Sequence, residues 1–98
     1  MPFTATIVAQ VQSTKPDALW AIATALGTTV QHEAGADAFV ALPGGGRVDV
    51  EVAKFGESLP LAIDVTDPHS PAAARASAQN ILDLVKQSTG WQVDHLHP

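Results

Sequence analysis

The residues best suited to chemistry are carboxylates on two neighbouring segments in the middle of the chain. Residues 47–53 and 59–66 alternate polar and apolar side chains, and five residues join the two segments. If they pair as an antiparallel hairpin, one register sets Asp49 directly opposite Asp64, and paired carboxylates of this kind serve as acid and base in several enzymes. A register shifted by two residues instead sets Arg47 opposite Asp64, which is an ordinary cross-strand ion pair.

A period of two assigns the valines and the acidic residues of these segments to opposite faces of a sheet. We expect Val48, Val50 and Val52 to face the core and the polar residues to face away from it. A solvated sheet face explains this pattern without any site, and a groove that binds a ligand or a partner is the alternative. The polar candidates for such a site are Arg47, Asp49, Glu51 and Asp64.

Three further motifs favour structural interpretations. Asp67-Pro-His69 offers a carboxylate and an imidazole, but Asp-Pro is typical of a turn, and the spacing supplies no third metal ligand. The glycine-rich segment 43–46 precedes a predicted strand instead of a helix, which favours a hairpin turn over a phosphate loop. His95 and His97 fall in a predicted C-terminal tail over 95–98. We therefore expect no metal ion and no cofactor.

The length, composition and charge of the chain limit the number of domains and the kinds of partner that we expect. Its 98 residues make one domain, which we place at residues 1–94. Five Lys and Arg residues are scattered among ten Asp and Glu residues, so the net charge is −5 and neither nucleic acid nor an anionic membrane is an expected partner. The absence of Cys excludes disulfides and thiolate chemistry. Without a membrane span or a signal-peptide pattern, we expect a small, soluble, acidic protein of the cytoplasm.

Periodicity and capping residues predict the remaining elements. Thr14 and Gly27 are the expected N-cap and C-cap of a first helix, and Ser70 and Gly90 take these roles for a second helix over 72–88. Alternating or β-branched segments predict strands over 3–12, 28–33, 37–42, 47–53, 59–66 and 91–94.

The length of one turn decides which face the residues of segment 37–42 occupy. If Gly44 and Gly45 form a two-residue turn, Phe39 faces Val50 and belongs to the core. Val40 and Leu42 then lie on the outer face and join the polar residues as candidate partner-binding residues. A loop of odd length would exchange the two faces, because one step of register moves every side chain to the other side. The two-residue turn is our prediction.

The order of elements, β-α-β-β-β-β-α-β, predicts an α+β fold. Right-handed crossovers place both helices on one face of a single sheet, which makes a two-layer sandwich with a mostly antiparallel sheet of five to six strands. This order resembles that of ferredoxin-like folds (βαββαβ) with one extra hairpin. The resemblance concerns the fold alone and implies no function.

The sequence favours a non-catalytic role, because it contains no recognisable catalytic motif and no cofactor loop. We expect a protein-interaction or self-associating module, in which a protein partner or a second copy of the chain covers the open sheet face. The alternative is a small-molecule binding protein or a small enzyme that uses the carboxylates of that face.

Overall fold

The computed structural model describes residues 3–11, 13–31, 38–42, 45–51 and 61–95 of the chain. The described elements, in chain order, are β1 (Phe3–Ala9), α1 (Lys15–Leu26), β2 (Val30–Gln31), β3 (Phe39–Ala41), β4 (Arg47–Glu51), β5 (Leu61–Asp67), α2 (Pro71–Thr89) and β6 (Val93–His95). Their order matches the predicted one.

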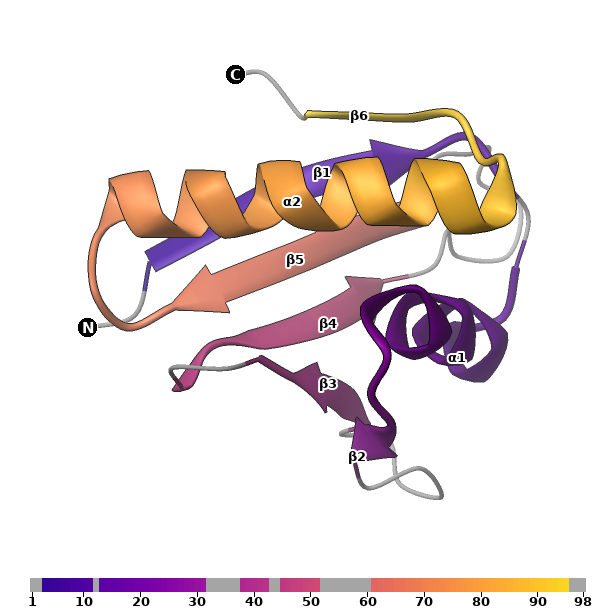
Figure 1. Ribbon diagram of the computed structural model, residues 1–98, viewed down its shortest axis with the longest axis horizontal. Helices are drawn as coiled ribbons and strands as arrows, with labels where there is room; N and C mark the ends of the chain where they lie inside the picture. The colour runs from indigo at the N-terminus through magenta and orange to yellow at the C-terminus, as the bar shows by residue number, and fades with distance from the viewer. Residues whose placement is uncertain (1–2, 12, 32–37, 43–44, 52–60, 96–98) are drawn as a thin grey trace.

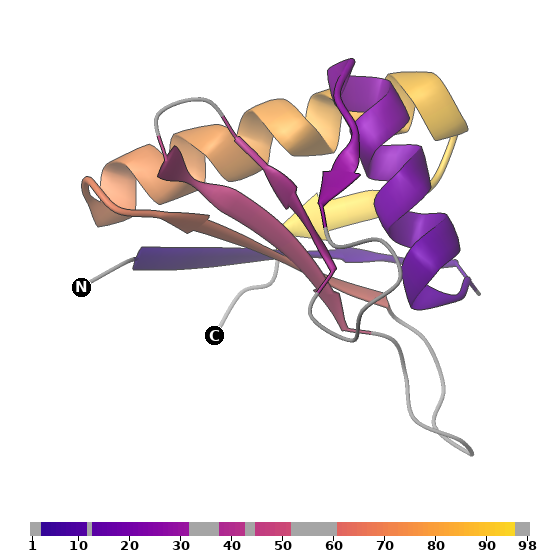
Figure 2. The ribbon, with the colours of Figure 1, turned by 90° about the horizontal axis from the view of Figure 1, so that it is seen from below.

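The strands form a single six-stranded sheet in the order β2-β3-β4-β5-β1-β6, and every neighbouring pair is antiparallel. Helix α1 connects β1 to β2, and α2 connects β5 to β6, so each crossover passes over strands that lie between its ends. Both helices lie on the same side of the sheet (Figures 1 and 2). The predicted two-layer α+β sandwich is therefore confirmed, and the β2–β3 hairpin extends its β4 edge.

Helix α1 begins and ends at the predicted capping residues. The side chain of Thr14 accepts a hydrogen bond from the N–H of Asp17 (3.3 Å), which satisfies one of the N–H groups that a helix start leaves unpaired. Gly27 closes the helix with φ at 72°, a left-handed conformation that residues with a Cβ rarely adopt. The helix turns Leu19 and Ile22 into the core.

Helix α2 also begins where the sequence predicts. The side chain of Ser70 accepts a hydrogen bond from the N–H of Ala73 (3.0 Å), and Pro71 is the first helical residue. The alanines of its buried face, Ala74 and Ala78, bring the helix axis close to β1 and β5. Among the described residues, neither helix has an apolar stretch of the length that a bilayer crossing requires.

The core lies between the sheet and the two helices and is entirely apolar among the described residues. On the central strand β5, Leu61, Ile63 and Val65 are buried, and on β4 Val48 and Val50 are 0% and 4% exposed. The predicted facing of these valines is confirmed, while Val52 lies outside the described residues. Full burial of one such side chain stabilises the fold by roughly 1.5–3 kcal/mol.

The pairing of β3 with β4 differs from the predicted one. Val40 lies opposite Val48, and the N–H of Leu42 donates to the carbonyl of Gly46 (2.8 Å). Three residues, 43–45, therefore lie between the last hydrogen-bonded residues of the hairpin instead of two. The predicted two-residue turn is therefore wrong, and Phe39 exchanges faces with Val40, which is 0% exposed. A Cβ on Gly46 would lie 2.7 Å from the carbonyl oxygen of Thr66, so only glycine fits at this end of the turn.

The C-terminal strand is also displaced from its predicted place. It covers Val93–His95 instead of 91–94, and Val93 is fully buried against β1. His95, which we assigned to the tail, therefore belongs to the sheet. Residues 96–98 lie outside the described part of the chain.

The one-sided sheet predicts opposite effects for two adjacent substitutions on β4. Val50→Asp places an unpaired charge beneath the helices and should lower the free energy of unfolding by about 3–5 kcal/mol. Asp49→Ala removes only a partly exposed ion pair and should change it by less than about 1 kcal/mol. Urea unfolding followed by circular dichroism measures both. If Asp49→Ala were the more destabilising of the two substitutions, the acidic residues of β4, and not its valines, would face the helices.

Candidate functional site

The sheet face that neither helix covers gathers most of the polar strand residues, and we call it the open face. The pairing registers of β1, β4 and β5 place their alternate residues side by side on it. Phe39 on β3 and Asp94 on β6 belong to the same face. Its polar residues on the three central strands are Thr4, Thr6, Arg47, Asp49, Glu51, Asp64 and Thr66.

Asp49 and Asp64 lie directly opposite each other, in the first of the two predicted registers. Each carboxylate has its own donor. The Nε and Nη2 atoms of Arg47 donate to the two carboxylate oxygens of Asp49 (2.9 and 2.8 Å), and the hydroxyl of Thr6 donates to Oδ1 of Asp64 (2.6 Å). These bonds offset the repulsion between two like charges at a cross-strand position.

Arg47 is held from a second side by an aromatic ring. Its guanidinium carbon lies 4.2 Å from the centre of the Phe39 ring, a cation–π contact. The contact depends on the three-residue connection between β3 and β4, because a two-residue turn would send Phe39 into the core. Sequence reasoning missed it for that reason, although a turn of odd length was the stated alternative.

The structure assigns the six sequence-predicted candidates to two sides of the sheet. Arg47, Asp49, Glu51 and Asp64 lie together on the open face as expected. The predicted placement of Val40 and Leu42 on this face is wrong, because the odd-length connection turns both toward the helices. Val40 is fully buried there, and Leu42 packs against the edge of the core.

The charged side chains at the centre of the open face are held in place by hydrogen bonds, but they remain accessible to water. In the Arg47–Asp49 pair the side chains are 43% and 33% exposed, and Glu51 and Asp94 are exposed. A solvated surface leaves catalytic groups without the low-dielectric surroundings that strengthen their electrostatic interactions. This arrangement therefore suits binding of a complementary charged surface better than acid–base chemistry.

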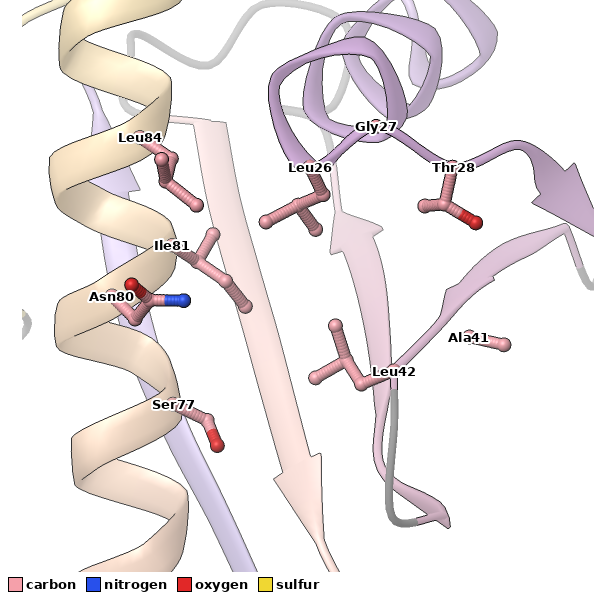
Figure 3. Close-up of a pocket in the computed structure, with 9 residues that line it drawn as sticks. All are labelled: Leu26, Gly27, Thr28, Ala41, Leu42, Ser77, Asn80, Ile81 and Leu84. Carbon is pink, nitrogen blue, oxygen red and sulfur yellow. The ribbon is translucent and has the colours of Figure 1, made fainter.

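A second candidate region lies on the helix side, and we call it the interhelix cleft. It has a volume of about 690 Å³ between the end of α1, the end of β3 and the middle of α2. Its larger side chains are Leu26, Leu42, Ile81 and Leu84, and its polar ones are Thr28, Ser77 and Asn80 (Figure 3). Sequence reasoning missed this cleft, because its lining comes from three segments that no local pattern connects.

Asp67 and His69 have the turn role that the sequence predicts. The N–H of His69 donates to Oδ1 of Asp67 (2.7 Å), and its Nδ1 lies 2.9 Å from the same oxygen. That backbone N–H, helped by the imidazole, holds the pKa of the Asp67 carboxyl below its ordinary value of 3.8, although partial burial opposes the shift. Among the described residues, no group of three potential ligands gathers around this pair or elsewhere.

The lowered pKa of Asp67 predicts an acid-dependent stability difference between the wild type and Asp67→Asn. Because the folded pKa lies below the unfolded one, the charge stabilises the fold above pH 3.8 and loses this effect as the pH falls through the folded pKa. The wild type should thus be the more stable protein at pH 7, and the two should converge in strong acid. Urea unfolding at a series of pH values measures this.

His69→Ala provides the control for the physical cause. It keeps the backbone N–H, which is the largest cause of the shift, so most of the pH-dependent difference should persist in this background. Its complete loss would assign the effect to the imidazole and contradict the explanation.

Comparison of the chain with protein-family models, with curated proteins and with solved structures finds no match.

Proposed function

We propose that this chain is a non-catalytic interaction module that binds a protein partner through the open face of its sheet. One observation supports this proposal most directly. The paired residues at the centre of that face are already held in place, Asp49 by Arg47 on the Phe39 ring and Asp64 by Thr6. Side chains that are ordered before binding lose less conformational entropy when a partner arrives.

The charge of the open face favours a basic partner. Among its described residues, the carboxylates of Asp49, Glu51, Asp64 and Asp94 outnumber the single guanidinium of Arg47. Lysine and arginine side chains on a partner would complement this surface and speed its approach. Phosphate groups would be repelled, which agrees with the expectation that nucleic acid is not a partner.

The same charge argues against a dimer in which two open faces meet. A two-fold axis would bring the same acidic surface of each copy together, and like charges at an interface cost free energy unless they are paired. A different protein with a basic surface is therefore a better match for this face than a second copy of the chain.

Charge reversal on the open face tests the proposal. The wild-type protein, immobilised and exposed to a lysate of the cells that naturally produce it, should retain one stoichiometric partner. Glu51→Lys should weaken binding to that purified partner by about ten-fold or more, because it places a cation against the partner's basic groups. Binding constants come from calorimetry.

The matched control is Asp83→Lys, which makes the same change in net charge at an exposed position of α2. It should bind the partner as the wild type does. Loss of binding in both variants would indicate a general charge effect and contradict the assignment to the open face. A wild-type protein that is strictly monomeric by light scattering and retains no partner would contradict the proposal as a whole.

A further inference from the structure

We propose that the interhelix cleft binds an uncharged small molecule that has an apolar body and one hydrogen-bonding group. The cleft lies on the helix side of the sheet, so this inference is independent of a partner on the open face. Its volume of about 690 Å³ is close to that of known ligand pockets, which span roughly 300–1,000 Å³ and often lie between helices.

The apolar part of the cleft is made of aliphatic side chains that the core covers only in part. Leu26 and Leu42 pack against the edge of the core and remain half-buried. Leu84 on α2 is half-buried as well. Ile81, which is 1% exposed, lies between them (Figure 3). A ligand with an apolar body would remove these surfaces from water, which is favourable in proportion to the area buried.

The polar groups of the cleft can pair with a neutral ligand. Ser77 and Asn80 lie along the α2 side and point into the cleft in Figure 3, and neither side chain makes a hydrogen bond within the described residues. The amide of Asn80 can donate and accept, and so can a serine hydroxyl. One hydroxyl, amine or amide group on the ligand would therefore find a partner here.

The lining disfavours a ligand of either charge, and the helix end further disfavours an anion. None of the lining residues that the structure describes carries an ionisable side chain. An anion or a cation would thus leave water without a counter-charge, which is costly. Helix α1 also ends in the wall of the cleft, at Leu26 and its cap Gly27, and the partial negative charge of a helix C-terminus disfavours anions further.

Two fluorescent probes with one shared skeleton test the class of ligand. N-phenylnaphthylamine is neutral, with an apolar body and one N–H donor, and anilinonaphthalene sulfonate adds a negative charge. The neutral probe should bind the folded protein with saturable fluorescence, and the sulfonate should bind at least about ten-fold more weakly. The methyl resonances of Leu26, Leu42 and Leu84 should shift on addition of the neutral probe.

Substitutions on one side of α2 locate the site. Ser77→Phe fills the cleft and should weaken binding of the neutral probe by about ten-fold or more. Ser88→Phe makes the same change three turns further along α2, at an exposed position outside the lining, and should leave binding unchanged. The wild-type methyl shifts locate the probe even if Ser77→Phe fails to fold.

Three results would overturn the proposal. The first is that the neutral probe shows no saturable binding. The second is that the methyl resonances that shift belong to residues away from the cleft, and the third is that both probes bind equally well.

Discussion

The burial of alternate residues on β4 and β5 beneath two helices is the constraint on which the rest of the structure depends. Val48, Val50, Ile63 and Val65 are almost completely removed from water, and each strand residue between them is turned to the other side. Residues that lie opposite each other on paired strands share a face of the sheet, so the same alternation holds on β1, which pairs with β5, and on β3, which pairs with β4. Because both helices lie on one side, this alternation divides the strand residues into a core set and an open-face set.

The open face is a consequence of that division, and the two opposed carboxylates at its centre are tolerated because each has a hydrogen-bond donor of its own. Opposed carboxylates would destabilise a cross-strand position if they were bare. Arg47 and Thr6 supply the donors, and Phe39 supports the guanidinium of Arg47. The same bonds hold the side chains of the central pair in place, and this is the basis of our proposal that the face binds a complementary surface. On the other side of the sheet, the end of α1, the end of β3 and the middle of α2 leave the interhelix cleft between them.

Features that depend on neighbours in the chain could be predicted from the sequence. The helix caps at Thr14 and Ser70 follow from side chains that bond the backbone three residues later, and the facing of Val48 follows from strict alternation. The face of Phe39 could not be predicted in this way. It depends on one residue of turn length, and that length is coupled to the close approach of Gly46 to the carbonyl of Thr66, a residue of another strand. The interhelix cleft was missed for a similar reason, since it exists only after three distant segments have packed.

Reactivity of single introduced cysteines tests the one-sided sheet most directly, because the natural chain has no cysteine and each variant therefore reports one position. Under native conditions Asp49→Cys and Phe39→Cys should react readily with a thiol reagent. Val48→Cys and Val40→Cys should react at least about ten-fold more slowly, since their sulfurs are reached only when the protein opens. Equal rates at all four positions, or the reverse order on either strand, would contradict the account.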